Sequence, residues 1–508
     1  MTTYSRPGVF IQEVELPQTI ALADSGNAVG AFTGALSKGP STVPVLLSSW
    51  SDFVKTFGGL NDAYPTTWAA YNFFANGGRQ LYVKRVVASD AVAASVTLTD
   101  GATTDLLEIT AKNPGAWGSD LAVQVNSAGT STRFGLSVFG APITAVTTSN
   151  LLSQWTDLSM DPADRNYVVS VINSDASSPV TIAVVGAATT FPTPAATLYS
   201  LTSGDDGTTL VRADYSGAYA SFDPINNPLV MYTPDAAYAS TDTISGQISG
   251  DLVIYCSGRT DAFAVLDTPS GMTVTGAQEQ VDDIKAIFAA SSAGEIAATY
   301  YPWISIPDAT KIPGATRLQA PGAAMVGQYL ATDASRGVFK TPAGLGNKIA
   351  LAVATESQLT NANLDALNSS TSPINVIRQV PGAGIVVMGG RTLDNTPGNR
   401  YINVRRSMIY LKKEITDLSG FAIFENNDSR LWGSIRTTLN VFLRSYWQQG
   451  GLRGSSPEQA FFVRCDASNN STADIQNGRV NIEIGVALEY PAEFVVIKLG
   501  QLTGNATA

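Results

Sequence analysis

Pro491-Ala492-Glu493-Phe494-Val495-Val496-Ile497-Lys498-Leu499 closes the most strongly patterned stretch of the chain, residues 401–499. This stretch predicts a strand, a long helix, a loop and a strand, followed by a last apolar strand with no obvious partner. The amino-terminal end is similar, because Gly8-Val9-Phe10-Ile11-Gln12-Glu13-Val14 predicts an alternating strand near the start. Such strands bind by extending an exposed sheet edge of another chain, and unpaired edges otherwise invite aggregation. Both ends of the chain therefore indicate assembly before they indicate chemistry.

The composition excludes several classes of chemistry. The 508 residues include no histidine, the commonest general base and metal ligand near neutral pH. This excludes Ser-His-Asp catalysis, Cys-His catalysis and histidine-ligated zinc, and leaves carboxylate-only enzymes open. Cys256 and Cys465 lie in apolar runs without a CxxC spacing and are interpreted as buried thiols. We therefore expect no catalytic residue, no metal and no cofactor.

The charge and hydropathy of the chain limit its partners. The net charge of −11 and a pI near 4.6 argue against nucleic-acid binding, which needs a basic footprint. No apolar run approaches the roughly 18 residues of a membrane span, and the first residues do not resemble a signal peptide. We expect a soluble protein made in the cytoplasm, with no direct membrane insertion.

A chain of this length is expected to hold several domains of about 150 residues each. Composition and pattern divide it into six segments. They are a strand arm (1–25), a compact α/β unit (26–90), a β-rich insertion poor in charge (91–250), an α/β segment (251–399), a carboxy-terminal domain (400–490) and a second strand arm (491–508).

Within these segments the pattern predicts individual elements. Short apolar runs predict strands at residues 167–172, 252–256 and 262–267. A helix is predicted over residues 281–290, where the pair Asp282-Asp283 is interpreted as an acidic helix start that the helix dipole favours. The run Gly344-Leu345-Gly346-Asn347-Lys348 lacks the full spacing of a phosphate-binding loop, so it does not indicate nucleotide binding.

The clearest predicted element is a long helix that begins after Asn427 or Asp428, either of which can cap it, and ends at Gly450. Arg430 and Arg444 share the face opposite its apolar stripe, about 21 Å apart at the usual helical rise. These arginines mark either a solvated face or a basic contact for an acidic partner surface. The apolar stripe consists of Leu431, Ile435, Leu439, Phe442 and Tyr446.

Several motifs together resemble the sheath proteins of contractile phage tails and related injection machines. The resemblance covers residues 1–90 and 250–508, and the middle of the chain resembles a variable insertion. The motifs are Arg6-Pro7-Gly8-Val9-Phe10-Ile11-Gln12-Glu13-Val14, Val29-Gly30-Ala31-Phe32-Thr33-Gly34, Phe73-Phe74-Ala75-Asn76-Gly77-Gly78, Tyr401-Ile402-Asn403-Val404-Arg405-Arg406, Gly450-Gly451-Leu452-Arg453-Gly454, Ala460-Phe461-Phe462-Val463-Arg464-Cys465-Asp466 and Pro491-Ala492-Glu493-Phe494.

The resemblance implies a multidomain fold of the α+β and α/β classes. Its sheath core would be built from the amino- and carboxy-terminal parts, with an outward-facing β-rich inserted domain and extended terminal strand arms. Subunits of this family form stacked hexameric rings around an inner tube, and the stack contracts without nucleotide to drive the tube through a host envelope. The expected location is the tail sheath of a virion, after assembly in the host cytoplasm.

The resemblance also implies partners and contact residues. The partners would be further copies of the chain, the inner tail tube protein, and the baseplate and tail terminator proteins. On the basic face of the long helix alone, the candidates for contact with that tube are Arg430, Arg436 and Arg444. The strands lent to neighbouring subunits would be Val9, Phe10, Ile11, Gln12, Glu13 and Val14 at the amino end, and Phe494, Val495, Val496, Ile497, Lys498 and Leu499 at the carboxy end.

Three alternatives stay open at this point. The first is the sheath of a tailocin or another extracellular contractile injection system rather than of a phage, although the large insertion favours a phage. The second is a carboxylate-based enzyme such as a glycosidase. The third is a static tube or capsid subunit, although a tube protein would be much shorter. A single chain that carries both sheath halves argues against the two-protein sheath of type VI secretion.

Overall fold

The computed structural model describes residues 28–100, 104–128, 133–186, 192, 197–239, 241–289, 293–369 and 371–493. At its centre lies a sheet with the strand order β18-β17-β13-β12-β11-β1-β3-β2. The strands from β17 to β3 run parallel, and β18 and β2 are antiparallel edges. The strands are β1 (Val29–Ala35), β2 (Val45–Leu47), β3 (Leu81–Val86), β11 (Leu229–Tyr232), β12 (Ala262–Asp267), β13 (Ala297–Tyr301), β17 (Asn375–Val380) and β18 (Gly384–Val387).

Helices cover both faces of this sheet. From β1 the chain crosses to β3 on one side, and from β11 it proceeds through β12 to β13 on the other. Right-handed crossovers in opposite directions place their helices on opposite faces. Accordingly α2 packs with α7, and α5 packs with α6. The helices are α1 (Trp50–Phe57), α2 (Pro65–Ala75), α4 (Arg212–Tyr219), α5 (Asp242–Arg259), α6 (Val274–Phe288), α7 (Gly322–Arg336) and α8 (Asn361–Ser369).

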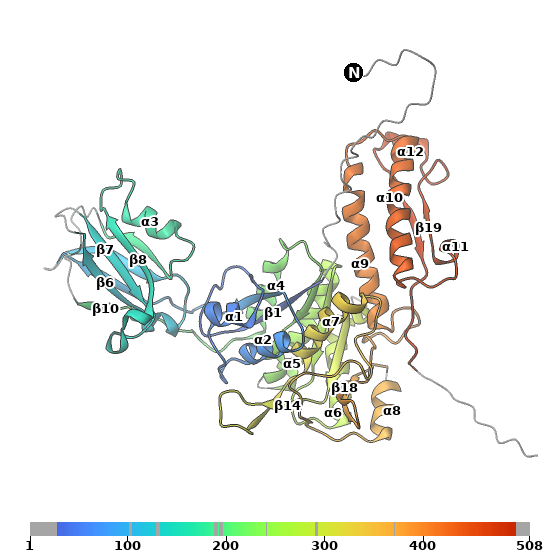
Figure 1. The fold of residues 1–508 in the computed structure, drawn as a ribbon, viewed down its shortest axis with the longest axis horizontal. Helices are drawn as coiled ribbons and strands as arrows, with labels where there is room; N and C mark the ends of the chain where they lie inside the picture. The colour runs from blue at the N-terminus through green and yellow to red at the C-terminus, as the bar shows by residue number, and fades with distance from the viewer. Residues whose placement is uncertain are drawn as a thin grey trace, which may run out of the picture.

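The β-rich insertion forms two antiparallel sheets with a hydrophobic core of their own, at the left of Figure 1. Its apolar core runs from Ala94 to Leu201. The sheets have the orders β10-β6-β7-β8 and β4-β5-β9. Their elements are β4 (Ser95–Thr99), β5 (Asp105–Ala111), β6 (Ala122–Ser127), β7 (Phe134–Phe139), β8 (Leu151–Leu158), α3 (Val168–Ser174), β9 (Val180–Val184) and β10 (Leu198–Ser200).

The carboxy-terminal boundary expected for the insertion is wrong. The sequence pattern assigns residues 212–250 to the β-rich segment, yet α4, β11 and the start of α5 belong to the central sheet and its core. Leu229, Val230 and Met231 lie between β1 and β12 and are buried. The weak charge pattern continues across the true boundary because a parallel strand buried on both faces is as apolar as an insertion strand.

Arg85, at the end of β3, fastens the insertion to the core. Its buried guanidinium donates hydrogen bonds to the carbonyl oxygens of Leu36, Ser37, Gly39 and Pro114. It also forms an ion pair of 3.8 Å with Asp206 at the far end of the insertion. One side chain thus contacts the core and two separate segments of the insertion, at Pro114 and at Asp206.

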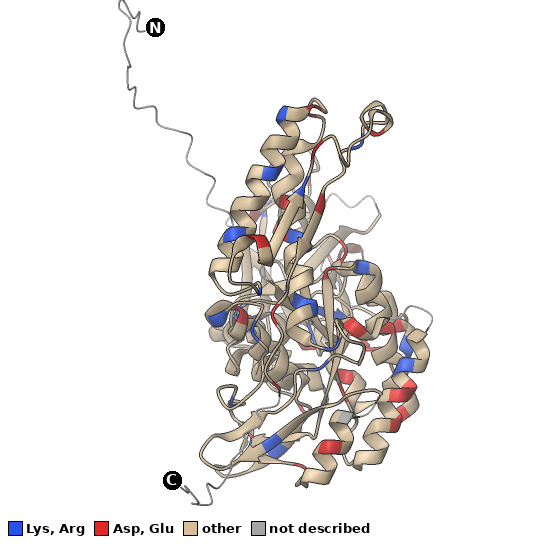
Figure 2. Cartoon of the chain, turned by 90° about the vertical axis from the view of Figure 1, so that its right-hand side faces the viewer, with Lys and Arg blue, Asp and Glu red and all other residues tan. Residues whose placement is uncertain are grey.

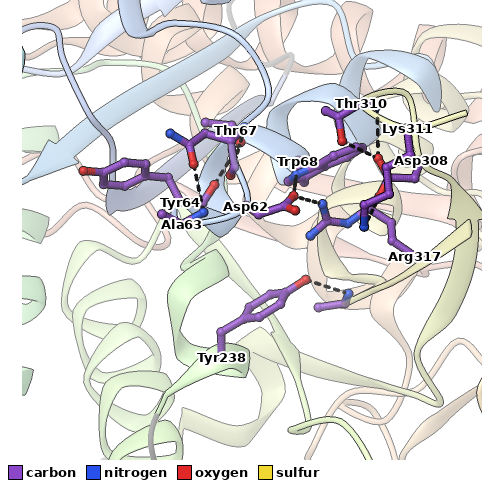
Figure 3. A network of polar contacts seen from close by, with 12 residues as sticks. Asp62, Ala63, Tyr64, Thr67, Trp68, Tyr238, Asp308, Thr310, Lys311 and Arg317 are labelled. Atoms are coloured by element: carbon purple, nitrogen blue, oxygen red, sulfur yellow. Dashed lines mark hydrogen bonds and ion pairs between the residues drawn. The ribbon is translucent and has the colours of Figure 1, made fainter.

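A small sheet of β14 (Ile304–Pro307), β15 (Thr316–Gln319) and β16 (Ala354–Thr355) lies beside α2. The guanidinium carbon of Arg317 lies 3.8 Å from the centre of the Trp68 ring, and Arg317 also pairs with Asp62 (Figure 3). Asp62 in turn accepts a hydrogen bond of 3.0 Å from Trp68 Nε1. This network fixes the β14–β15 hairpin, whose exposed tip carries Ile312.

Three strand predictions are wrong in the same way. Residues 252–256 lie inside α5, residues 168–172 lie in α3, and residues 402–406 open a helix. Short apolar runs of β-branched and aromatic residues do not separate a buried helix from a buried strand. The strand over residues 262–267 is confirmed as β12, which is buried throughout. Asp282-Asp283 lies in the middle of α6, which begins at Val274, so its reading as a helix start is also wrong.

The residues from 400 to 493 form a module of two long helices and a hairpin, coloured orange to red in Figure 1. We call it the C-terminal module. Asp428 caps α10 by accepting hydrogen bonds from the amides of Arg430 and Leu431, which confirms one of the two predicted caps. Its elements are α9 (Ile402–Ser419), α10 (Ser429–Gln448), α11 (Pro457–Ala460), β19 (Phe461–Arg464), α12 (Thr472–Gln476) and β20 (Glu483–Val486).

No helix within the described ranges is both long and apolar enough to cross a membrane.

Candidate assembly interface

The C-terminal module carries a sheet of two strands, β19 and β20. They pair antiparallel with Phe461 opposite Val486 and Arg464 opposite Glu483. No third strand among the described residues joins either edge. Hairpins of two strands are marginally stable alone, so this one depends on the helix beneath it. The module therefore presents a short sheet with two open edges.

One face of this hairpin is packed and the other is exposed. Phe461 belongs to an apolar cluster with Leu443 and Tyr446 of α10, and the buried Cys465 packs with Leu439. On the outer face Phe462 is exposed. Because the helix supports one face only, a further strand can be added in the plane of the sheet without displacing the core.

The hydrogen bonds at the end of the hairpin show which backbone groups face outward. The amide of Ala487 donates to the carbonyl of Ala460 at 2.8 Å, so this pair is hydrogen-bonded across the ladder. Hydrogen-bonded and non-hydrogen-bonded pairs alternate along an antiparallel ladder. The backbone groups of Ile484 and Val486 therefore point away from β19. No other described backbone segment pairs with them, so they can pair with an incoming strand.

The loop between β19 and β20 is held by an amide network. Asn481 donates its backbone amide to Asn470 Oδ1 at 2.6 Å and its side-chain amide to the carbonyl of Asn469 at 3.0 Å. Asn469 and Asn470 return hydrogen bonds to the carbonyl of Asn481. The strands are thus held in register although 18 residues lie between them, from 465 to 482.

Ion pairs and amide hydrogen bonds attach the module to the central sheet. Arg406 of α9 pairs with the buried Asp333 of α7. Burial raises the pKa of Asp333, and the nearby charge of Arg406 partly offsets this rise. Arg405 pairs with Glu295 at 2.7 Å. Asn403 donates to the carbonyl of Phe339, outside the module, and to that of Glu489, within it, both at 3.0 Å. These contacts gather at the first turns of α9 and leave the rest of the module projecting, as Figure 1 shows.

A second anchor lies where the carboxy-terminal strand is predicted to begin. Arg391 donates to both carboxylate oxygens of Glu493, at 2.8 Å and 2.6 Å, and Tyr401 donates to the same carboxylate at 3.2 Å. The side chains of Arg391 and Glu493 are only 9% and 20% exposed. Glu493 is the last described residue before the predicted strand 494–499. The root of the predicted arm is therefore fixed to the core.

The structure describes the three predicted tube-facing arginines but not the two predicted lent strands. The lent strands, Val9–Val14 and Phe494–Leu499 in the sequence, lie outside the described residues. Arg430 and Arg444 are exposed on α10 and form no ion pair with any described residue, whereas Arg436 pairs with Asp466 at 3.7 Å. Figure 2, which faces the outer side of the module, shows basic positions spaced along its helices rather than gathered in one patch.

The described residues hold no group of three or more metal-ligating side chains. Burial raises the pKa of both Cys256 and Cys465 above that of an ordinary thiol, which confirms the reading of buried thiols. Asp267 is buried at the carboxyl end of β12, where it accepts hydrogen bonds from Tyr232 Oη at 2.6 Å and from the amide of Gly322 at 2.9 Å. Its environment is that of a structural carboxyl group.

Comparison with known proteins extends these observations. The family described as "Phage tail sheath C-terminal domain" matches residues 394–499, which contain the C-terminal module, Glu493 of the second anchor and the predicted arm strand. Residues 394–499 therefore belong to the family of phage tail sheath C-terminal domains. This is a family of structural proteins, not of enzymes.

Individual sheath proteins are similar over different lengths. The tail sheath protein of Vibrio phage KVP40 is 28% identical over 125 residues, which are 24% of this chain and 18% of that protein. The sheath subunit of the PVC extracellular contractile injection system, in its contracted state, is 21% identical with a TM-score of 0.54 and covers 99% of both chains. A chain of the anti-feeding prophage baseplate is 20% identical with a TM-score of 0.58, over 98% of this chain and 99% of that one.

These similarities confirm the expected multidomain α/β fold of a sheath protein. Sequence reasoning missed Arg391, Tyr401 and Arg406 as anchors of the sheath module. Tyr401 and Arg406 lie in the quoted motif Tyr401-Ile402-Asn403-Val404-Arg405-Arg406, and the partner of Arg391 and Tyr401, Glu493, lies in Pro491-Ala492-Glu493-Phe494. An acidic residue just before a partnerless strand was the available signal for Glu493.

Proposed function

We propose that this chain is the subunit of a contractile tail sheath, stacked as hexameric rings around an inner tube. The open β19–β20 hairpin, carried on a module anchored at its base, is the observation that supports this proposal. An open edge with outward amides accepts an extended strand through main-chain hydrogen bonds. The sequence supplies candidate strands at both of its ends.

In this proposal residues 9–14 and 494–499 of neighbouring subunits extend the β19–β20 hairpin. The Arg391–Glu493 anchor fixes where the carboxy-terminal strand leaves its own subunit. A lent strand stays covalently joined to its own core while it is bound to its neighbour. Rings can therefore rotate and shorten without dissociating.

Contraction in this scheme needs no nucleotide. It requires only that the contracted lattice bury more or better surface than the extended one. A differential contact on the order of a few kcal/mol per subunit would be multiplied along the stack. The β-rich insertion would face outward, because it lies at the far end of the molecule from the C-terminal module in Figure 1.

The tube-facing residues proposed here are Arg430, Arg436 and Arg444. Arg430 and Arg444 are exposed and unpaired among the described residues, so they can meet acidic groups on a tube. Exposed ion pairs contribute about 0–1 kcal/mol each, so they can register subunits and still break during contraction. Arg436 is already paired with Asp466 and would have to exchange that partner.

The proposed particle is a phage tail, assembled in the host cytoplasm, in which the sheath also meets a baseplate and a tail terminator. A tailocin or another extracellular contractile injection system is the second candidate. It is favoured by the two structural neighbours from such particles. Electron microscopy of particles purified from the source would separate the candidates, because only a phage carries a DNA-filled head on its tail.

Negative-stain electron microscopy of the full-length chain, expressed with and without its cognate inner tube protein, tests the proposal. Wide, ridged, hollow cylinders from the chain alone, or sheathed tubes after co-expression, are the expected result. Dispersed monomers under both conditions would contradict the proposal.

A further inference from the structure

The loop that joins α9 to α10 exposes an apolar cluster at the tip of the C-terminal module. We call residues 420–428 the tip loop. Phe424 is 104% exposed and Ile423 is 70% exposed, and Phe421 of the same loop is also exposed. The neighbouring α12 adds the exposed Ile475. Exposed apolar patches of this kind commonly mark interaction sites on soluble proteins.

The backbone of Phe424 makes this exposure more notable. Its φ angle is +65°, in the left-handed region that costs a bulky side chain on the order of 1 kcal/mol. The side chain gains no burial in return among the described residues. Two unfavourable features at one residue indicate that the side chain acts outside its own subunit.

Hydrogen bonds tie the tip loop down at both of its ends. The side chain of Asn427 donates to the carbonyl of Arg479 and accepts from Trp432 Nε1, both at 2.9 Å. Asp428 caps α10 at one end of the loop, and the amide of Ile423 donates to the carbonyl of Gly420 at the other. A loop tied down at both ends loses less conformational entropy on binding, so even a small apolar contact becomes useful.

We propose that the tip loop is the apolar contact of each subunit with the inner tube, with Phe424 entering a shallow apolar pocket on the tube surface. This inference rests on the proposed sheath function. It adds an apolar contact beside Arg430, which lies in the first turn of the adjoining helix α10.

The size and place of the patch favour the tube over a second copy of the chain. A stable subunit interface buries about 800 Å² on each partner, far more than a few side chains supply. A small contact repeated along a stack gives avidity while each contact stays breakable. The tip also lies one helix of 18 residues, roughly 27 Å, from the base where both anchors gather. Strand exchange at the hairpin would provide the permanent contact between copies.

Co-sedimentation of full-length chain with preassembled tubes of the cognate inner tube protein tests this inference. Phe424→Asn is the informative variant, because asparagine tolerates the left-handed conformation and removes the apolar ring. Phe424→Gly is a second variant that relieves the backbone cost. Ile312→Asn, at the exposed tip of the β14–β15 hairpin, is the matched control.

We expect both Phe424 variants to melt at or above the wild-type temperature, to self-assemble like the wild type, and to bind tubes at least tenfold more weakly. The Ile312→Asn variant should bind like the wild type. Unchanged tube binding by both Phe424 variants would overturn the inference. Loss of self-assembly by those variants would also overturn it, because the contact would then lie between copies. If the wild type neither assembles nor binds tubes, the proposed function itself fails.

Discussion

Arg391 and Glu493 lie 102 residues apart in the sequence and form a bidentate, largely buried ion pair. Arg391 is fixed in turn, because its backbone exchanges hydrogen bonds with the side chain of Asn375 in β17 and its Nη1 donates to the carbonyl of Asn368. Glu493 is thus attached to the central sheet, and the last predicted strand follows it directly. The pair links the sheath core to its proposed carboxy-terminal arm.

Replacing Arg391 by Met should lower the free energy of unfolding by about 3 kcal/mol, because it leaves the Glu493 carboxylate partly buried without its main partner. Chemical denaturation followed by tryptophan fluorescence measures this change. Arg464→Met is the matched control. Its pair with Glu483 is 52% and 53% exposed, so the loss should stay below about 1 kcal/mol. Equal losses of unfolding free energy in the two variants would show that the Arg391–Glu493 pair stabilises the fold no more than an exposed ion pair does.

Stability should fall as the pH rises from 5 to 8. Burial raises the pKa of Asp267 to about 7 and that of Asp235 to about 6, so the folded state holds protons that the unfolded state has released. This stabilisation is fully present below the pKa of the unfolded state and is lost as the pH rises through the pKa of the folded state. For Asp267 the loss in the free energy of unfolding is on the order of 3 kcal/mol. The chain has no histidine that would titrate in the same range.

Urea denaturation at pH 5, 6, 7 and 8 measures this dependence. Asp267→Asn keeps an acceptor for Tyr232 and Gly322 but cannot ionise, so its stability should change much less over the range. A wild-type stability that is flat or rises from pH 5 to pH 8 would show that these carboxyl groups titrate normally.

Ile484→Pro should block assembly more than Ile484→Ala does. Both variants lose the side-chain packing of Ile484, but only proline removes the outward amide that an added strand would use. Edge strands tolerate proline where the amide is not part of the ladder, so the monomer should fold in both cases. Sedimentation velocity of the two purified variants measures assembly. Equal assembly would mean that this edge accepts no strand.

Arg444→Glu should weaken tube-dependent assembly severalfold, and the wild-type contact should weaken as salt is raised, because screened surface charges carry it. The control is Lys55→Glu, an equal charge change on the exposed side of α1. Counting sheathed tubes in micrographs of co-expressed material provides the measurement. Normal extended sheaths from Arg444→Glu would exclude Arg444 as a tube contact.

Sequence pattern correctly predicts those helices and strands whose residues specify them locally. The strand over residues 262–267 and the long helix capped by Asp428 are confirmed. The run Leu252-Val253-Ile254-Tyr255-Cys256 was misread because a buried helix and a buried strand are equally apolar over five residues. The sequence offers a signal for Glu493, but its pairing with Arg391 and the exposure of Phe424 depend on tertiary packing, which local pattern does not predict.

The most direct test of the account is a cryo-electron microscopy map of the assembled cylinders at a resolution that separates strands. The account predicts that β19 and β20 lie in a wider sheet, with added strands traced to residues 9–14 and 494–499 of neighbouring subunits. A hairpin that keeps both edges open in the assembled state, or is extended only by strands of its own subunit, would contradict it.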